Sequence, residues 1–351
     1  MSAPPLLITG AAGWLGRRLV AALRGEVPEA PAWSSAAPPA LRCLLERRED
    51  AAALPEDRTL DLRHGDLRQP AALRAFCEKA GGAVLFHLAA VIHPRRSSRE
   101  FEHVNVRGTA ALLEAAEDAG VRRVVVMSST SPVGTNPDPT HRFDETAPYR
   151  PYVGYGRSKM KVEQLAAAAA ARGRLETVVV RAPWFYGPMQ PARQSEWFRM
   201  IQRGDAPIVG GGDNVRSMAY LDNLCQGLIL AAQHPAAAGQ TYWVADRRPY
   251  SMNEIVDTVE RLLRDEFDIP VTGRRLRLPG LAAKLAYATD WTLQRLGLYH
   301  QKIHVLSEMN KNIACRIDKA ERELGYAPTV DLEEGMRRSL RWCVEHGVPL
   351  R

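Results

Sequence analysis

The sequence predicts an α/β protein with a doubly wound parallel sheet and a smaller, mainly helical C-terminal region. Three observations predict this fold class. Short apolar runs alternate with helix-length amphipathic stretches through the first half of the chain. These runs are apolar throughout, which is typical of strands buried on both faces. A glycine-rich turn directly follows the first run, and the alternation fades after residue 184.

The expected strands are "PLLIT" (5–9), "LRCLLE" (41–46), "AVLFHLA" (83–89), "RVVVMSS" (123–129) and "ETVVVRA" (176–182). Helical patterns lie between them at 14–25, 70–80, 99–119 and 152–172. Right-handed crossovers between parallel strands bring the carboxyl ends of all strands to one edge, where ligands bind. The Pro-, Ala- and Ser-rich stretch at 28–40 predicts a surface loop.

The second half of the chain predicts a helical region that caps this edge. Helices are expected at 194–203, 222–234, 251–264, 279–296 and 331–346. We place the boundary between residues 1–183 and 184–351, with the chain crossing between the two regions. The segment 276–300 carries Leu, Trp and Tyr at helical spacing, which indicates core packing or a lid over an apolar substrate. Its Arg and Lys residues leave docking on a membrane surface as the alternative.

Composition describes an ordinary globular protein. The 351 residues are 46% hydrophobic and 25% charged, enough for a sizeable core and more than one typical domain. The net charge of +7 comes from arginines scattered along the chain, so we expect no nucleic-acid partner. A basic face that attracts anionic cofactors and a charge without function both stay open.

Several further classes are excluded on pattern. The five cysteines form no C-x-x-C pair and predict buried free thiols, and the nine histidines show no metal-ligand spacing, so no metal is expected. No window has the roughly 20 apolar residues that cross a bilayer, so we expect no integral membrane segment. The first residues carry no basic stretch or cleavage pattern, and we predict a cytoplasmic location.

The stretch "TGAAGWLG" places Gly10, Gly13 and Gly16 between the first strand and the first helix. Small residues there let the backbone approach a phosphate, and the helix N-terminus offers free N–H groups. Gly16 would let the helix pack closely against the sheet. The spacing therefore indicates a dinucleotide phosphate site, with a plain tight turn as the alternative.

The second expected strand ends at Glu46, which could accept hydrogen bonds from an adenosine ribose and so favours NAD. Arg47 and Arg48 follow at once and could instead hold the 2′-phosphate of NADP. We favour NAD slightly. Asp66 and Leu67 follow a short strand and could meet the adenine ring, although Asp66 could equally be an N-cap or turn residue.

The segment "YGRSK" places Tyr155 and Lys159 four residues apart on one face of a helix. A phenol ionises near pH 10, and an adjacent ammonium lowers that pKa, which makes an acid/base pair. Ser128, Ser129 and Thr130 end the strand upstream, at the same edge as the glycine turn. A hydroxyl there could hold a substrate oxygen against Tyr155. No G-x-S-x-G elbow surrounds them, which excludes a serine hydrolase.

Seven motifs in this order resemble the extended short-chain dehydrogenase/reductase family, a branch of the NAD-dependent epimerase/dehydratase superfamily. They are "TGAAGWLG", "FHLAA" (86–90), "NVRGT" (105–109), "MSSTSPVG" (127–134), "YGRSK", "RAPWFYGP" (181–188) and "RSMAYLDN" (216–223). The resemblance covers most of the chain. It implies a Rossmann-like domain that binds NAD(H) or NADP(H), a smaller substrate region, and the homodimer usual for the family.

The resemblance also assigns residues. Tyr155 matches the acid/base, Lys159 its partner, and Ser129 the catalytic hydroxyl, with Thr130 as the alternative; Asn105 matches a structural position. Cofactor contacts are implied for Gly10, Ala12, Gly13, Trp14, Leu15, Glu46, Arg47, Asp66, Leu67, Leu88, Ala89, Ala90, Tyr155, Lys159 and Pro183. Substrate contacts are implied for Thr130, Val133, Trp184, Phe185 and Arg216.

Two departures from the family pattern bear on the substrate. Trp184 takes the position where sugar epimerases carry an asparagine that touches the nucleotide-sugar, and Val133 replaces a tyrosine. Trp184, with Phe185 beside it, suits an apolar substrate and the 3-beta-hydroxysteroid dehydrogenase-like branch. Arg216 corresponds to an arginine that grips a diphosphate in sugar-nucleotide enzymes, or it is structural.

The leading hypothesis is therefore an NAD(P)-dependent oxidoreductase that exchanges a hydride with a ketone or secondary alcohol of a fairly apolar substrate, steroid-like or otherwise hydrophobic. The first alternative is a nucleotide-sugar epimerase or dehydratase with bound NAD. The second is a dinucleotide-binding sensor or scaffold without catalysis, against which the Ser129, Tyr155 and Lys159 set argues.

Overall fold

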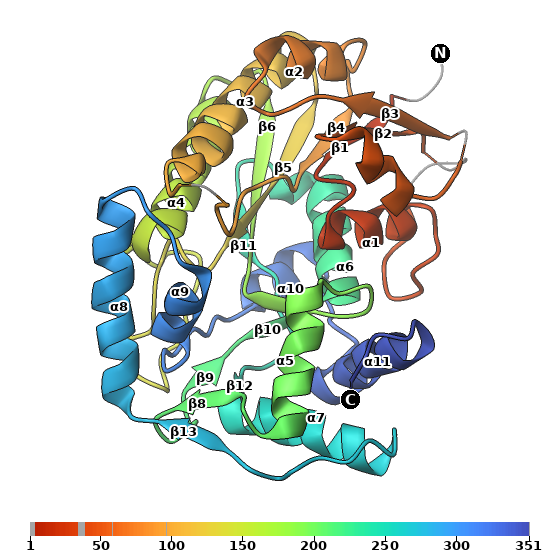
Figure 1. Ribbon diagram of the computed structural model, residues 1–351. Helices are drawn as coiled ribbons and strands as arrows, with labels where there is room; N and C mark the ends of the chain where they lie inside the picture. Colours follow the sequence, from red (N-terminus) through yellow and green to blue (C-terminus); the bar gives the residue numbers. More distant parts are fainter. Residues whose placement is uncertain (1–3, 34–38, 58, 96, 351) are drawn as a thin grey trace.

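The fold is built on a seven-stranded parallel sheet with strand order β11-β6-β5-β4-β1-β2-β3 (Figure 1). The computed structural model describes residues 4–33, 39–57, 59–95 and 97–350. The strands are β1 (Leu6–Thr9), β2 (Leu41–Leu45), β3 (Leu60–His64), β4 (Val84–His87), β5 (Arg123–Ser129), β6 (Glu176–Ala182) and β11 (Thr241–Trp243). Every pair of neighbours in it is parallel, so the doubly wound parallel sheet is confirmed.

Helices cover both faces of the sheet. On one face pack α1 (Trp14–Leu23) and α6 (Leu221–Gln233), and on the other α2 (Pro70–Cys77), α3 (Gly108–Asp118) and α4 (Val153–Ala171). A π-helical segment, η2 (Phe101–Arg107), leads into α3. Along β1, Leu6 and Ile8 face the first layer and Leu7 the second. Because side chains alternate along a strand, burial on both sides explains the unbroken apolar runs.

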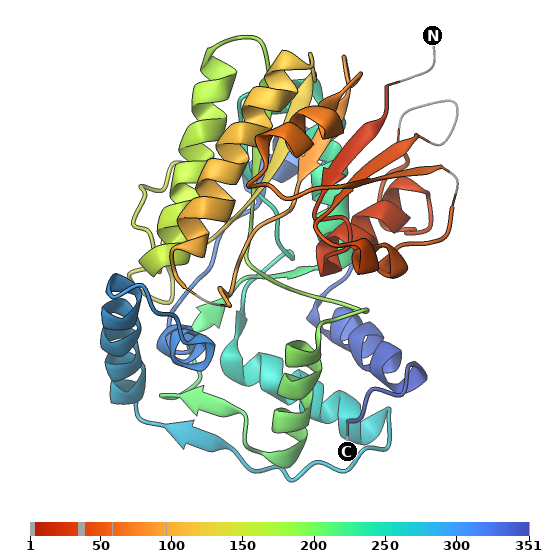
Figure 2. The ribbon, with the colours of Figure 1, turned by 45° about the horizontal axis from the view of Figure 1, so that its top comes forward.

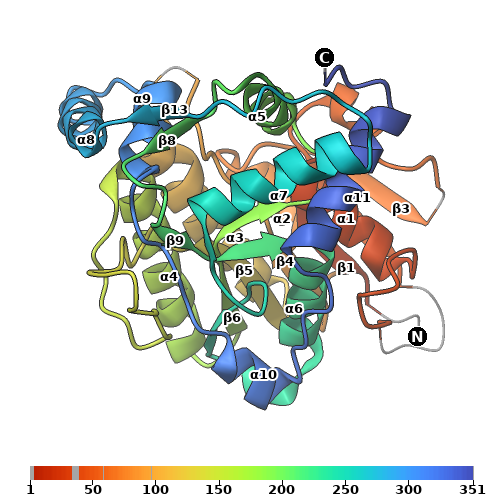
Figure 3. The ribbon, with the colours of Figure 1, turned by 90° about the horizontal axis from the view of Figure 1, so that it is seen from below.

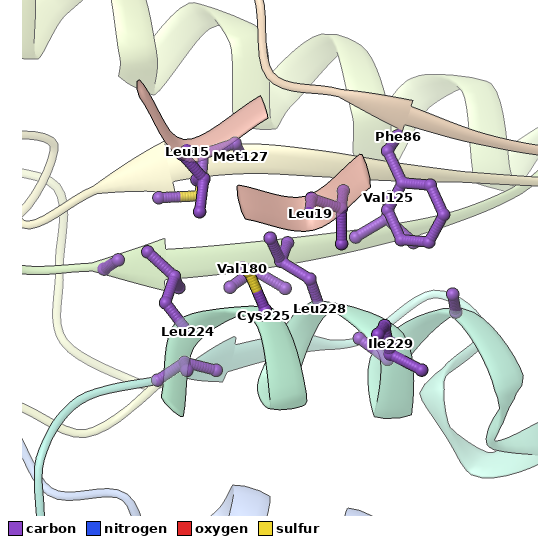
Figure 4. Close-up of a cluster of buried hydrophobic side chains, with 14 of the residues drawn as sticks. Leu15, Leu19, Phe86, Val125, Met127, Val180, Leu224, Cys225, Leu228 and Ile229 are labelled. Carbon is purple, nitrogen blue, oxygen red and sulfur yellow. The ribbon is translucent and has the colours of Figure 1, made fainter. Parts of the chain in front are cut away.

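Figure 4 shows the core between the sheet and the pair α1 and α6. Leu15 and Leu19 of α1 lie near Val125 and Met127 of β5. Beside α1 on the same face of the sheet, Leu224 and Leu228 of α6 approach Val180 of β6. This packing holds the N-terminus of α1 at the carboxyl edge of the sheet, where β1 ends.

The rest of the chain forms a layer below that edge (Figures 1 and 3). Its helices are α5 (Ala192–Arg203), α7 (Met252–Asp265), α8 (Gly280–Arg295), α9 (Gln301–Glu308) and α11 (Leu332–Glu345). Helix α10 (Asp318–Leu324) instead packs against α6 and β11 beside the sheet. The short strands of the layer pair as β7 (Trp184–Tyr186) with β10 (Met218–Tyr220), β8 (Pro207–Val209) with β13 (Leu276–Leu278), and β9 (Val215–Arg216) with β12 (Tyr250–Ser251). Two 3-10 turns, η1 (Arg48–Ala53) and η3 (Pro235–Ala237), complete the elements.

The expected strands and helices are present, with ends that shift by a few residues. The division at residue 183 is not clean in space, because α6 and β11 come after it and join the sheet and its core. The predicted loop at 28–40 falls partly outside the described residues, at 34–38. Its described part is anchored, since Gln226 of α6 donates to the Glu29 carbonyl over 3.1 Å.

The prediction that the leucines of 276–300 pack into the core is wrong for Leu281, Leu285 and Leu296, which are 62%, 61% and 70% exposed. The buried residues of α8 are small or polar: Ala283, Ala286, Asp290 and Gln294. The side chains of Asp290 and Gln294 bond to His304 and to the Gly154 N–H, so this polar side of α8 faces the protein.

Candidate active site

The turn after β1 requires its glycines. Gly10 has φ +76°, and a Cβ on it would lie 2.8 Å from the backbone N of Ala89. The N–H of Gly13 donates to the Gly10 carbonyl over 3.0 Å, and a Cβ on Gly16 would lie 2.1 Å from that same oxygen. No described side chain caps α1 at Gly13, so the first N–H groups of the helix are open to an anion.

Buried hydrogen bonds of His87, which we call the His87 strut, hold the end of β1 that carries this turn. The His87 ring bonds to the Thr9 hydroxyl through Nδ1 and to the Thr109 hydroxyl through Nε2, each over 2.8 Å. Burial lowers the pKa of His87 to about 3, so the ring is neutral. The Thr9 hydroxyl also accepts from the Ala89 N–H over 3.3 Å, which fixes the strand end that carries Leu88, Ala89 and Ala90. Sequence reasoning missed this strut.

A hollow of about 400 Å³ opens at the ends of β2 and β3. Its lining comprises Glu46, Arg47, Arg48, His64, Gly65, Asp66 and Gln69. The predicted residues Glu46, Arg47 and Asp66 are thus brought together, whereas Leu67 turns inward and is buried against Gly108. Arg68, which sequence reasoning missed, pairs with Asp66 and lies 3.9 Å from the Glu46 carboxylate. Asp66 also accepts from the Arg68 backbone N–H over 2.8 Å, the turn role that was left open.

Ser129, Tyr155 and Lys159 meet where β5 ends against the first turns of α4. Tyr155 is partly buried, and this burial raises the pKa of its phenol, whereas the neighbouring Ser129 hydroxyl acts in the opposite direction. The Lys159 ammonium is buried and donates to the Met127 carbonyl over 2.8 Å. Burial lowers the pKa of Lys159 to about 8, against the opposing charge of Glu163.

The two residues that flank Ser129 are both buried. Ser128 is buried and donates to the Glu163 carboxylate, on the α4 side of the sheet. Thr130 is also buried, and its carbonyl accepts from the N–H groups of Val133 and Gly134. Ser129 is the neighbour that acts on the pKa of Tyr155, and its hydroxyl oxygen accepts from the Ser131 N–H over 3.3 Å. Val133 is buried in the core below the site.

Asn105, on η2, joins two segments beside the site. Its amide donates to the Val91 carbonyl over 2.9 Å and to the Ser158 hydroxyl over 3.1 Å, and its oxygen accepts from the Val91 N–H. These bonds tie the strand-end segment after Ala90 to α4, one residue from Lys159.

The lower layer closes over the glycine turn through β7. The Phe185 ring lies 5.2 Å from the Trp14 ring at the start of α1, and the Trp14 indole donates to the Pro188 carbonyl over 2.7 Å. Trp184 contacts the Trp197 ring at 5.3 Å and the Arg216 guanidinium at 6.0 Å. Pro183, between β6 and β7, is buried. Both predicted aromatic residues thus lie between the turn and the lower layer.

An aromatic wall beside Tyr155, made of Phe101, Tyr299 and His93, was missed by sequence reasoning. The Phe101 ring lies 5.9 Å from the Tyr155 ring, and the Tyr299 ring lies 6.0 Å from Phe101 at 90°. The Tyr299 hydroxyl bonds to Nδ1 of His93 over 2.7 Å, across 206 residues of sequence. Tyr299 comes from the α8–α9 connection, which is held against α4 because Gln294 accepts from the Gly154 N–H over 2.9 Å.

The Arg216 guanidinium lies over the Trp184 ring. Among the described residues, no carboxylate lies within 4 Å of it. Burial lowers the pKa of its guanidinium, while Glu308 and Tyr152 act in the opposite direction. All five cysteines are buried and free, which confirms that prediction. Across the described ranges, no three His, Cys, Asp or Glu side chains gather in a way that could hold a metal ion.

The comparison with known proteins decides the family. Residues 6–245 match the model of the NAD dependent epimerase/dehydratase family. The protein belongs to this family. The resemblance expected from the seven motifs is thereby confirmed, together with a family cofactor of the NAD(P) type.

This family member has relatives that are named for different activities. It is 51% identical over 348 residues to uncharacterized protein y4nL of Sinorhizobium fredii, covering 99% of this chain and 97% of the relative. It is 30% identical to a Stigmatella aurantiaca ketoreductase named for a farnesyl-dihydroquinoline-oxide substrate, covering 94% and 93% of the two chains. The crystal structure of DesIV, a dTDP-glucose 4,6-dehydratase from Streptomyces venezuelae with NAD and TYD bound, superposes with a TM-score of 0.74 at 25% identity, covering 99% and 100%. More distant relatives include 3-beta-hydroxysteroid dehydrogenases and a UDP-glucose 4-epimerase.

The residues of this family member fit a dinucleotide. Gly10 and Gly16 leave a backbone cradle that a Cβ would fill, and the uncapped start of α1 faces it. The hollow at Glu46, Arg47 and Asp66 continues along the same sheet edge, where β2 and β3 end beside β1. The turn would hold the pyrophosphate and the hollow the adenosine.

Proposed function

We propose that this protein is an NAD(P)-dependent oxidoreductase that interconverts a ketone and a secondary alcohol on a fairly apolar substrate. The observation that carries the proposal is the aromatic wall of Phe101, Tyr299 and His93 beside Tyr155. Aromatic rings offer large apolar contact area with few polar groups, which suits a hydrophobic ring system or isoprenoid better than a sugar. Trp184 and Phe185 add two more rings on the lower layer.

The dinucleotide, when bound, supplies or accepts the hydride. Tyr155 gives a proton to the substrate oxygen during reduction and takes it back during oxidation. Ser129, which lies near Tyr155, would hold that oxygen within reach of the phenol. The buried ammonium of Lys159 lies one helical turn from Tyr155 and favours the phenolate when the proton leaves.

Cofactor preference follows from the hollow. Glu46 would bond to a ribose hydroxyl and would repel a 2′-phosphate, whereas Arg47 would attract one. The Arg68 guanidinium pairs with Asp66 and lies 3.9 Å from Glu46. Arg68 therefore neutralises the charge of Asp66 more than that of Glu46, and the Glu46 carboxylate keeps most of its negative charge. We therefore propose NAD as the preferred cofactor.

A nucleotide-sugar epimerase or dehydratase is the second candidate, and Arg216 favours it. A partly buried guanidinium without a carboxylate within 4 Å among the described residues suits a diphosphate or another anion. The two candidates make different demands on substrate, since the first needs an apolar carbonyl compound and the second a sugar diphosphate.

The deciding experiment incubates the protein with reduced or oxidised cofactor and follows absorbance of the reduced form. The panel contains bicyclic ketones, steroids, isoprenoid ketones and nucleotide-sugars, and sugar products are separated by chromatography. We expect cofactor oxidation with apolar ketones, and a loss of roughly 10²–10⁴-fold in turnover in Tyr155→Phe with cofactor binding retained. Tyr287→Phe, whose ring on α8 contacts Tyr152 at 5.4 Å, is the matched control and should keep its turnover. Conversion of a nucleotide-sugar without net change in cofactor would establish the second candidate, and cofactor binding without any turnover would establish a sensor.

A further inference from the structure

Helix α8 presents its apolar side to solvent. Its buried side carries Asp290 and Gln294, which bond to each other, to His304 and to the Gly154 N–H. On the opposite side, Leu281, Leu285 and Leu296 are spaced at i, i+4 and i+15, so they share one face. Exposed leucines contribute no free energy of hydrophobic burial to folding, so this stripe of leucines marks a surface that another molecule covers.

The exposed apolar surface extends beyond this stripe. Trp291 lies on the flank of α8, Leu298 in the connection to α9, and Val305 on α9, and all three are more than two-fifths exposed. We call this set, with the three leucines, the α8 face. In Figures 1, 2 and 3, α8 lies at the outer edge of the molecule, and no described element covers its outer side. Its packing partners are α9, α4 and β8, all on the inner side.

The exposed charges of the segment 276–305 have one sign. The exposed charged residues between 276 and 305 are Arg277, Lys284, Arg295 and Lys302. The sole acidic residue of that stretch, Asp290, is fully buried. Within the described ranges, none of the four cations pairs with a carboxylate within 4 Å, although neighbouring arginines such as Arg275 do. The Arg295 guanidinium lies 5.1 Å from the Trp291 ring centroid, which joins the cationic rim to the apolar face.

We propose that the α8 face docks on the surface of an anionic phospholipid bilayer. Leucines and a tryptophan on one side of a helix, rimmed by cations, are the composition of a helix that lies in the membrane interface. Among the described helices, none is long and apolar enough to pass through a bilayer, so the contact is with the surface. This inference goes beyond the proposed function and does not depend on it.

A second copy of the chain fits this face less well. A two-fold contact brings the same patch of both subunits together, so the four cations would face four more cations. Such like-charge pairs destabilise an interface, whereas phosphatidylserine headgroups neutralise the rim. Charge complementarity therefore favours the anionic lipid surface.

The test is co-sedimentation of the full chain with vesicles of equal parts phosphatidylcholine and phosphatidylserine, and with vesicles of phosphatidylcholine alone. We expect binding to the anionic vesicles and much weaker binding to the neutral ones. Lys284→Glu with Arg295→Glu should lower the partition coefficient by roughly 30-fold. Leu281→Ser with Leu285→Ser should lower it by roughly tenfold or more. All four positions are exposed, and circular dichroism checks that the variants fold.

Matched controls carry the same chemical changes elsewhere. Arg264→Glu with Arg322→Glu reverses two exposed arginines on α7 and α10, and Val344→Ser removes an exposed apolar side chain on α11. These controls should bind like the wild type. Absence of binding to anionic vesicles, or binding that the α8 variants share in full, would overturn the proposal. A wild-type dimer that Leu281→Ser with Leu285→Ser converts to a monomer in light scattering would assign the face to a second copy and overturn it equally.

Discussion

The ammonium of Lys159 on α4 donates to the main-chain carbonyl of Met127 on β5, with 2.8 Å between Nζ and O. Met127 lies two residues before Ser129, so this bond fixes the first turns of α4 against the strand end that carries the Ser129 hydroxyl. The carbonyl partly replaces the water that Lys159 loses on burial, but the pKa of Lys159 still falls to about 8.

Activity should therefore decline in mildly alkaline solution. As the pH rises through about 8, Lys159 loses its proton and no longer stabilises the phenolate of Tyr155. We expect kcat/KM to show an alkaline limb near that pH, since kcat/KM reports the pKa values of the free enzyme. In Lys159→Met the limb should vanish, with activity lowered by roughly 10²-fold. The control is Lys161→Met, which removes an exposed lysine of α4 that pairs with Glu102 of η2. A limb unchanged in Lys159→Met would contradict this role.

Two glycines with positive φ allow the clash of an added Cβ to be separated from the cost of the backbone conformation. Gly10 and Gly25 have nearly the same φ, +76° and +80°, but a Cβ on Gly25 would meet nothing within 4 Å. Gly25→Ala should therefore cost only about 1 kcal/mol of unfolding free energy. Gly10→Ala adds a clash with the Ala89 backbone, for a total of roughly 3 kcal/mol, and should weaken NADH binding by roughly tenfold or more. Urea unfolding and cofactor fluorescence measure both effects. Equal losses in the two variants would show that space at Gly10 is unimportant.

Local spacing was sufficient to predict the parts of the site that lie within one turn or one strand end. Gly10 and Gly16 follow β1 directly, and Tyr155 and Lys159 share one helix face, so the sequence predicted these groups correctly as neighbours. The parallel order of the strands then predicted that Ser129 would reach Tyr155, because all strands end at the same edge.

Contacts between distant segments were not accessible in this way. Tyr299 reaches His93 across 206 residues, and no periodicity in either segment points to the other. The orientation of α8 was equally hidden, since a helix with leucines on one side normally buries them. The bond between Asp290 and His304, over 2.8 Å, sets the opposite orientation.

The His87 strut predicts a pH-dependent stability. In the unfolded chain the histidine takes up a proton below about pH 6.5, whereas in the fold the ring stays neutral down to about pH 3. The unfolded state thus binds more protons between these values, so stability is full above pH 6.5 and falls as the pH decreases. Between pH 7 and pH 5 this group should contribute a loss of about 2 kcal/mol. His87→Gln should show a correspondingly smaller loss in urea unfolding, and the exposed His346→Gln should behave like the wild type. A wild-type slope in His87→Gln would contradict the assignment.

The hollow at the end of β2 predicts how cofactor preference can be changed. Glu46 is exposed to the hollow, and its nearest cation, Arg68, pairs more closely with Asp66. Replacing its charge in Glu46→Gln should remove the repulsion of a 2′-phosphate and raise the ratio of kcat/KM for NADPH over NADH by about tenfold. Arg47→Ala should lower that ratio, because it removes the cation that would attract the phosphate. Glu49→Gln, an exposed carboxylate outside the lining, is the control. A ratio that Glu46→Gln leaves unchanged would show that the ribose lies elsewhere.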